Sequence, residues 1–287
     1  MPELPEVETI ARGLQKRVAG DAIESVWLGC KPQTMKSPPA EIAATLEHTR
    51  IREVRRMGKH IVFELERNGA GPTHKPAKTR KKIKSLGPRS QWIVHLGMTG
   101  RMVVCPPDEP LEKHTHAVAR LASGRELRFV DPRRFGRLSV SIHGDFDAGG
   151  IEPLEIDSDR FLRLFHGRNT PIKSALLNQK LLRGVGNIYA DEALFRVGIR
   201  PKRRLSTVPR AKLELLRSAI REVLKEAIRL GGSSISDYVD ADGEEGFFQL
   251  QHRVYGREGE PCLICRAPIK RVVIGGRSSH YCPNCQK

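Results

Sequence analysis

Residues 172–195 read Ile-Lys-Ser-Ala-Leu-Leu-Asn-Gln-Lys-Leu-Leu-Arg-Gly-Val-Gly-Asn-Ile-Tyr-Ala-Asp-Glu-Ala-Leu-Phe, two helical patterns joined by glycines. Apolar side chains recur at helical spacing and predict helices over 171–182 and 187–197. Gly184-Val-Gly186 would form a tight turn between them, with Asn187 as the N-cap of the second helix. Backbone N–H groups at a helix N-terminus beside such a turn suit a phosphate. The stretch predicts a helix–turn–helix unit with an anion site.

Helical spacing continues on both sides of this unit. It predicts helices over 158–166 and 209–230, the second ended by two glycines. Residues 232–246 are rich in Gly, Ser and Asp and are expected to form a loop. We therefore expect a helical domain over 151–250.

Two CxxC motifs follow in the C-terminal segment 251–287. Sixteen residues separate the pairs, whose members are Cys262, Cys265, Cys282 and Cys285. This spacing is typical of a structural zinc ribbon, in which four thiolates close a tetrahedral Zn²⁺ site. A redox dithiol or a chance pairing is the alternative. Arg277, between the pairs, would lie at a hairpin tip, either gripping a phosphate or simply solvated.

The first half, 1–150, has strand-like patterns instead. They cover 23–28, 51–65, 92–105 and 116–140, with a hairpin turn at 123–125. An amphipathic helix over 5–18 precedes them. The basic segment 67–91 interrupts them and is expected to be a flexible loop between two paired strands, either a contact for DNA or a solvated tether. The fold class is α+β: a β-sandwich-like domain with an N-terminal helix, then the helical domain and the ribbon.

The charge of the chain points to a polyanionic partner. Lys and Arg number 50 against 33 Asp and Glu, a formal net charge of +17, and neutralising phosphates drives nonspecific binding. There is no run of 18 apolar residues, so no membrane span is expected. The acidic N-terminus lacks the apolar core of a signal peptide. We expect a location in the cytoplasm, on the nucleoid.

The N-terminus carries a candidate nucleophile. Once Met1 is removed, Pro2 becomes a secondary α-amine with a pKa of roughly 8, so part of it is unprotonated near neutral pH. Such an amine attacks a carbon that bears a leaving group and forms an iminium. Glu3 and Glu6 supply carboxylates for proton transfer. The alternative is an ordinary Met-Pro start with acidic residues in a first helical turn.

Two glycine-flanked runs in the β-rich half carry candidate wedge residues, His95-Leu-Gly-Met98-Thr-Gly100 and Asp131-Pro-Arg133-Arg134-Phe135-Gly136. Apolar side chains beside arginine are used to unstack a base step and fill the gap. Core packing is the alternative for Met98 and Phe135. Lys59, at the end of Arg-Arg-Met-Gly, is either a strand-edge charge or a phosphate contact.

Together these runs resemble the bacterial formamidopyrimidine-DNA glycosylase family from residue 2 to the end, apart from 67–91. The resemblance rests on PELPEVET at 2–9, the Lys59 turn, HLGMTG, DPRRFG, the 172–195 run, the 231–262 run and the cysteine pairs. It implies excision of oxidised purines from double-stranded DNA, with Pro2 attacking the sugar C1′, followed by strand cleavage. It also implies roles for further residues: Glu3 and Glu6 as acid/base and support; Lys173 in handling the base; Met98, Arg133 and Phe135 in filling the void; Lys59, His95, Asn187 and Arg277 in gripping phosphates.

Two other functions remain open from the residues. Related enzymes for oxidised pyrimidines typically begin Pro-Glu-Gly-Pro, and Leu4 here favours the purine branch. A protein that binds DNA structure without catalysis would use only the helix–turn–helix unit and the ribbon. The family implies one structural Zn²⁺ and a monomer.

Overall fold

The computed structural model describes residues 1–67, 89–233 and 246–287. These residues divide into two compact units. The β unit holds residues 1–2, 6–67 and 89–147, and the helical unit holds residues 3–5, 148–233 and 246–287.

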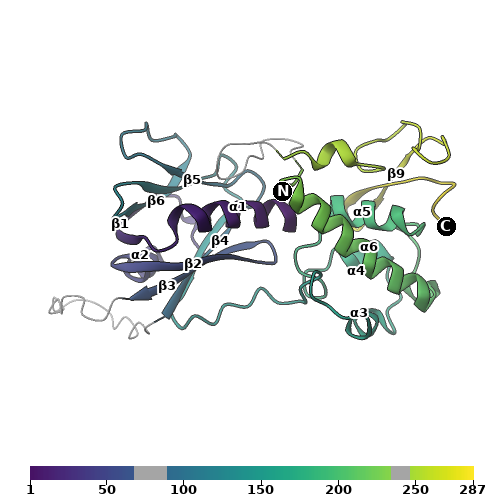
Figure 1. The fold of residues 1–287 in the computed structure, drawn as a ribbon, viewed down its shortest axis with the longest axis horizontal. Helices are drawn as coiled ribbons and strands as arrows, with labels where there is room; N and C mark the ends of the chain where they lie inside the picture. The colour runs from purple at the N-terminus through teal and green to yellow at the C-terminus, as the bar shows by residue number, and fades with distance from the viewer. Residues whose placement is uncertain (68–88, 234–245) are drawn as a thin grey trace. The chain divides into compact units, whose positions relative to one another are not determined.

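The β unit is built on one eight-stranded antiparallel sheet in the order β5-β7-β6-β1-β2-β3-β4-β8 (Figure 1). Its strands are β1 (Ala22–Leu28), β2 (Thr49–Met57), β3 (His60–Arg67), β4 (Arg89–His95), β5 (Arg101–Cys105), β6 (Thr115–Leu121), β7 (Glu126–Val130) and β8 (Arg137–Ser141). The predicted segments 51–65 and 92–105 each contain two strands. β4 and β5 do not pair, because β4 lies between β3 and β8 while β5 pairs with β7.

Helix α1 (Leu4–Val18) confirms the helix predicted over 5–18 and runs along the sheet (Figure 1). Its apolar stripe, from Val7 through Leu14 to Val18, is buried in one core with the strands because residues three and four apart share a helix face. Phe63 and Trp92 stack in this core with ring centroids 4.9 Å apart. Helix α2 (Pro39–Leu46) and the 3₁₀ turn η1 (Pro32–Thr34) were not predicted from the sequence.

Tight turns set the strand register. Gly58 (φ +60°) connects β2 to β3 and Gly124 (φ +81°) connects β6 to β7, a left-handed backbone that glycine adopts at no steric cost. The hairpin predicted at 123–125 is therefore confirmed. β3 and β4 are paired, as expected of the strands on either side of the basic segment. Its predicted bounds of 67–91 were too wide, because Arg67 and residues 89–91 belong to strands; residues 68–88 lie outside the described chain.

The helical unit contains α3 (Ser158–Phe165), α4 (Ile172–Leu176), α5 (Asn187–Arg196), η2 (Leu205–Thr207), α6 (Arg210–Arg229) and η3 (Phe248–Gln251). They surround a core that includes Tyr189 and Phe248. The hairpin of β9 (Lys270–Ile274) and β10 (Arg277–Tyr281) completes the unit. The α+β class, with a sheet domain, a helical domain and a ribbon, is confirmed. No described helix has the length and apolar character needed to cross a bilayer.

Two predictions around the glycine turn were wrong in detail. Helix α4 ends at Leu176, because the Leu181 N–H returns to the Asn178 carbonyl in a turn. Gly186, with extended backbone (φ −130°, ψ −162°), is the N-cap of α5, and Asn187 is its first residue. Most of the loop expected over 232–246 lies outside the described residues.

Candidate functional site

Glu3, in the helical unit, lies at the N-terminus of α5. Its carboxylate is 4% exposed, and Oε1 accepts the Ile188 N–H at 3.2 Å. The Leu4 N–H donates to the Gly184 carbonyl at 3.0 Å. A Cβ at Gly186 would lie 2.1 Å from Glu3 Cδ, so only glycine leaves room for this carboxylate. A carboxylate is stabilised at a helix N-terminus because backbone N–H groups point at it.

Lys173 is fully buried in the same unit. Its Nζ lies 2.7 Å from Asp191 Oδ1, with both side chains 0% exposed, and donates to the Ser278 carbonyl at 2.7 Å. Burial lowers the pKa of Lys173, while the charges of Asp191 and Glu3 oppose that shift. Asp191 Oδ2 accepts the backbone N–H of His280 at 2.9 Å. The pair therefore joins α4 and α5 to β10.

Arg277 lies at the hairpin tip, as predicted. It is exposed and pairs with Ile274 across a turn in which Gly275 and Gly276 both have positive φ, at +56° and +73°. A Cβ at Gly275 would lie 3.4 Å from Ser174 Oγ of α4. The tip is thus held against α4 on one side, and through Ser278 it is held by Lys173.

A second buried carboxylate, Glu192, holds the backbone of Tyr255, a neighbour of Asn187. Tyr255 makes a side-chain hydrogen bond with Asn187. Glu192, 0% exposed, accepts the backbone N–H groups of Arg253, Val254 and Tyr255 at 2.9–3.0 Å. Burial raises the pKa of Glu192, although these three donors act in the opposite direction. Glu192 therefore fixes the backbone from which Tyr255 reaches Asn187.

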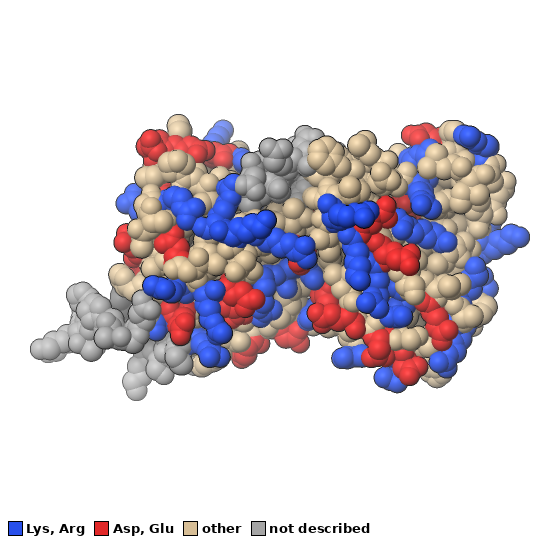
Figure 2. All heavy atoms as spheres, in the orientation of Figure 1, with Lys and Arg blue, Asp and Glu red and all other residues tan. Residues whose placement is uncertain are grey.

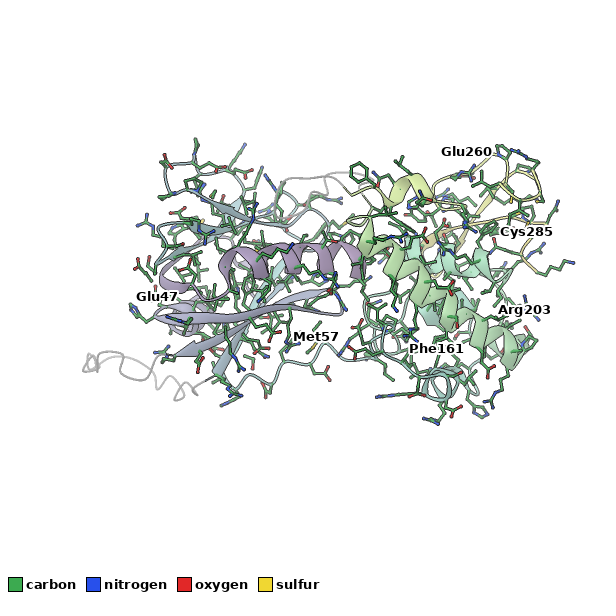
Figure 3. The ribbon with its side chains drawn as sticks, viewed as in Figure 1. Glu47, Met57, Phe161, Arg203, Glu260 and Cys285 are labelled. Atoms are coloured by element: carbon green, nitrogen blue, oxygen red, sulfur yellow. The ribbon has the colours of Figure 1, made fainter. Side chains whose placement is uncertain are left out.

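In the β unit, the structure brings Lys59 and His95 together. Register places His60 opposite His95, with ring centroids 5.0 Å apart. Lys59 is the second residue of the turn that follows Met57; Met57 is labelled in Figure 3. Arg56 fixes that turn, bonding to the Gly58 carbonyl at 3.2 Å and to Glu8 at 2.8 Å.

His95 is held as a neutral donor. Burial, together with the nearby His60 and Lys59, lowers its pKa to about 4. Its Nδ1 accepts the Gly97 N–H at 3.1 Å. The ring proton therefore sits on Nε2, which can donate a hydrogen bond without bringing a charge.

The two glycine-flanked runs come together in the β unit. Met98 is 41% exposed and Phe135 is 48% exposed, so core packing is wrong for both. The Arg133 guanidinium lies 5.1 Å from the Phe135 ring centroid. Buried Asp131 ties the runs together, accepting from the Thr99 hydroxyl at 2.7 Å and from the Gly136 N–H at 2.7 Å. An apolar and cationic edge is thus presented on a fixed base.

Pro2 and Glu6 also belong to the β unit. Pro2 is partly buried, Glu6 is 2% exposed and Met1 is 49% exposed. Figure 2 shows Lys and Arg side chains on the viewed face of each unit, with Asp and Glu among them. Both units therefore present basic side chains on this face.

The four ribbon cysteines converge. Their sulfurs all lie within 4.8 Å of one another, with Cys262–Cys285 at 3.9 Å and Cys265–Cys282 at 3.4 Å; Cys285 is labelled in Figure 3. A tetrahedral Zn²⁺ with Zn–S bonds of about 2.3 Å needs sulfurs about 3.8 Å apart. The donor set and the spacing both fit one such ion.

Three residues that hold Lys173, β10 and Tyr255 in place were not predicted from the sequence: Asp191, Glu192 and His280. The first two look like ordinary polar positions of a helix, and their partners lie far along the chain. No local pattern marks them.

Comparison with known proteins agrees with this architecture. Family models match three segments: formamidopyrimidine-DNA glycosylase N-terminal domain over 1–138, its H2TH domain over 150–239, and the zinc finger found in FPG and IleRS over 259–287. The formamidopyrimidine-DNA glycosylase of Solibacter usitatus is 44% identical over all of both chains, and that of Dechloromonas aromatica is 41% identical.

Solved structures agree as well. The crystal structure of MutM (FPG) from Thermus thermophilus has a TM-score of 0.82 at 40% identity and covers 99% of this chain and 98% of that one. A complex of Lactococcus lactis Fpg with DNA containing an abasic site has a TM-score of 0.84 at 32% identity and covers 99% of each chain. The chain belongs to the formamidopyrimidine-DNA glycosylase family.

Proposed function

We propose that this protein is a DNA glycosylase and AP lyase of base excision repair. It excises oxidised purines, including 8-oxoguanine and formamidopyrimidines, and then cleaves the strand. Full-length identity to named glycosylases supports the activity, and Leu4 favours purine over pyrimidine lesions. The observation that carries the proposal is the position of Glu3. It follows Pro2 in the chain, and its carboxylate accepts the Ile188 N–H at the N-terminus of α5.

The reaction proceeds through the α-amine of Pro2. Because the sugar C1′ is hidden in the duplex, the damaged nucleotide is first flipped out. The amine attacks C1′, the bond from C1′ to the base breaks, and the sugar ring opens to give an iminium. The iminium acidifies the C2′ protons, so elimination first expels the 3′ phosphate. A second, δ-elimination expels the 5′ phosphate.

Glu3 moves the protons of this sequence and Glu6 supports the site. Glu3 protonates the sugar ring oxygen as it leaves C1′ and later accepts a proton. A carboxylate confined between Gly186 and Ile188 N–H suits this role because its position is fixed before substrate arrives. Lys173, whose charge acts on Glu3, contributes to handling the oxidised base from the buried pair with Asp191.

Other residues hold the DNA. Lys59, His95, Asn187 and Arg277 bind phosphates around the lesion. Met98, Arg133 and Phe135 fill the space left by the flipped nucleotide, with Arg133 facing the orphaned cytosine. The exposure of Met98 and Phe135 supports this role.

The remaining assignments concern organisation. The four cysteines would hold one Zn²⁺, which supplies a rigid cross-link and no open coordination position for catalysis. We further propose three domains over 1–150, 151–250 and 251–287, a monomer, and a location on bacterial nucleoid DNA.

Borohydride reduction tests the proposed function. The protein is incubated with duplex containing 8-oxoguanine, and a covalent adduct is expected. Pro2→Gly should sharply reduce its yield, and duplex with thymine glycol should give less adduct than 8-oxoguanine. A protein that binds the lesion duplex tightly yet forms no adduct would be a DNA-binding protein without this chemistry.

A further inference from the structure

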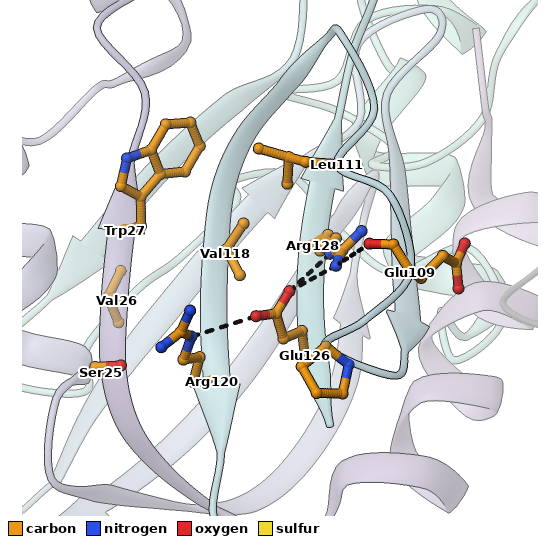
Figure 4. Close-up of a pocket in the computed structure, with 10 residues that line it drawn as sticks. Ser25, Val26, Trp27, Glu109, Leu111, Val118, Arg120, Glu126 and Arg128 are labelled. Atoms are coloured by element: carbon orange, nitrogen blue, oxygen red, sulfur yellow. Dashed lines mark hydrogen bonds and ion pairs between the residues drawn. The ribbon is translucent and has the colours of Figure 1, made fainter. Parts of the chain in front are cut away.

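A cavity of about 520 Å³ lies on the β unit, away from the residues described so far (Figure 4). Its floor is the face of β1, β6 and β7 opposite the core. Two cross-strand rows form it. Trp27 pairs with Val118, which pairs with Arg128; Ser25 pairs with Arg120, which pairs with Glu126.

One end of the cavity is an apolar slot. The Trp27 indole is 50% exposed and Leu111 is 55% exposed, and Figure 4 shows them on either side of the opening above Val118. A Cβ at Gly29 would lie 3.5 Å from the indole Cη2, so the ring packs beside the backbone there. Two half-exposed apolar groups on a fixed sheet suit a flat ring, because an exposed aromatic face offers stacking.

The other end carries Arg120, whose positive charge is only weakly paired. The Arg128 guanidinium is engaged, donating to Glu126 and to the carbonyls of Glu109 and Pro110. Arg120 contacts Glu126 only through Nε, at 3.3 Å, and is 70% exposed. Glu126 thus balances Arg128, while the Glu109 carboxylate points away from Trp27 (Figure 4). The terminal nitrogens of Arg120 remain available to an anion.

An extended peptide does not suit this cavity. β6, at the centre of the floor, is paired with β1 on one side and with β7 on the other. On the outer side of β1, the Val26 N–H donates to Glu47 Oε1 at 3.2 Å. Strand addition needs a free edge, and these backbone groups are already used. Side chains must therefore recognise the ligand. They suit a ligand with a flat ring at one end and an anionic group at the other.

We propose that this cavity binds a nucleotide, with the base against Trp27 and Leu111 and the phosphate on Arg120. The site goes beyond the proposed glycosylase function and does not rest on it. Its ligand is either a free mononucleotide or one nucleotide of a single strand.

Tryptophan fluorescence provides the test, because the only other tryptophan, Trp92, is 1% exposed. The protein is first saturated with undamaged duplex, which occupies the DNA-binding surface, and then titrated with dGMP, guanosine or the single strand (dT)5. We expect dGMP to quench the Trp27 emission and guanosine to bind more weakly. Tighter binding of (dT)5 would identify a strand as the ligand, and equal or weaker binding would identify the free nucleotide.

Variants measured by calorimetry complete the test. Trp27→Ala should weaken dGMP binding about tenfold or more, since stacking on an aromatic ring carries much of such affinity, while Trp27→Phe should retain it. Arg120→Gln should weaken dGMP and leave guanosine unchanged. Arg52→Gln, an exposed arginine on neighbouring β2, is the matched control. Borohydride trapping should be unchanged in all four. Equal dGMP binding by wild type and Trp27→Ala, or equal affinity for dGMP and guanosine, would overturn the proposal.

Discussion

Asp191→Asn tests the buried network that joins α4, α5 and β10. Asparagine has nearly the same shape, so the change removes the charge and leaves the packing intact. The Lys173 ammonium, 0% exposed and 2.7 Å from Asp191, would then be left without its buried counter-ion. Removing one partner of such a pair costs about 3–5 kcal/mol. We expect the free energy of unfolding to fall by about this amount.

Urea denaturation at pH 7 measures the loss, and a double-mutant cycle with Lys173→Met isolates the pair. The two single changes should be strongly non-additive, because the double variant contains no unpaired charge. Asp159→Asn, which breaks the exposed pair with Arg210, is the matched control and should change nothing measurable.

A pH series adds a signature that lost packing would not give. In Asp191→Asn the pKa of folded-state Lys173 is depressed further below its ordinary value of 10.5. Between the folded-state pKa and 10.5, the unfolded chain therefore binds more protons than the folded chain. The stability deficit should therefore shrink as pH rises toward 10.5. A loss of less than about 1 kcal/mol, typical of a surface pair, would show that Lys173 does not depend on Asp191 as its buried counter-ion.

Three further predictions concern single features. Gly186→Ala should lower adduct formation about 100-fold, because its Cβ would lie 2.1 Å from Glu3 Cδ and move the carboxylate; Gly29→Ala, with ordinary contacts, is the control, and normal trapping by Gly186→Ala would contradict the assignment. Because burial lowers the pKa of His95 from 6.5 to about 4, the neutral ring contributes stability that is complete above pH 6.5 and is lost as pH falls through 4, by up to about 3 kcal/mol. His95→Gln should lack this pH dependence; urea midpoints that fall with pH as steeply in His95→Gln as in the wild type would contradict this. Chelation should release one Zn²⁺ per chain and weaken binding of undamaged duplex, and Cys262→Ser should weaken that binding as well. Unchanged binding by metal-free protein would show that the ribbon does not contribute to DNA binding.

The sequence predicted those features that local chemistry determines. The CxxC pairs, the Gly124 turn and the stripe of α1 each depend on residues within a few positions of one another. The sheet order was not predictable in this way, because β4 and β5 look like one continuous strand and yet lie apart in the sheet. The early end of α4 depends on a turn at Asn178, which its apolar leucines do not reveal.

Several features of the candidate site also depend on residues far apart in the sequence and could not be predicted. Exposure of Met98 and Phe135 depends on Asp131 drawing two distant runs together, so the pattern alone left core packing open. The contacts of Lys173 with Asp191 and Ser278 join residues 18 and 105 positions apart. Burial of a lysine becomes tolerable only once these partners are in place, and no short motif indicates it.

Locating the covalent bond tests most directly whether Pro2 is the nucleophile. Protein with Met1 removed is reduced by borohydride on 8-oxoguanine duplex, digested, and analysed by mass spectrometry. We expect the sugar remnant to be attached to the nitrogen of Pro2, and we expect protein that retains Met1 to bind the duplex without forming an adduct. A remnant on a lysine side chain, or full trapping with Met1 in place, would contradict this expectation.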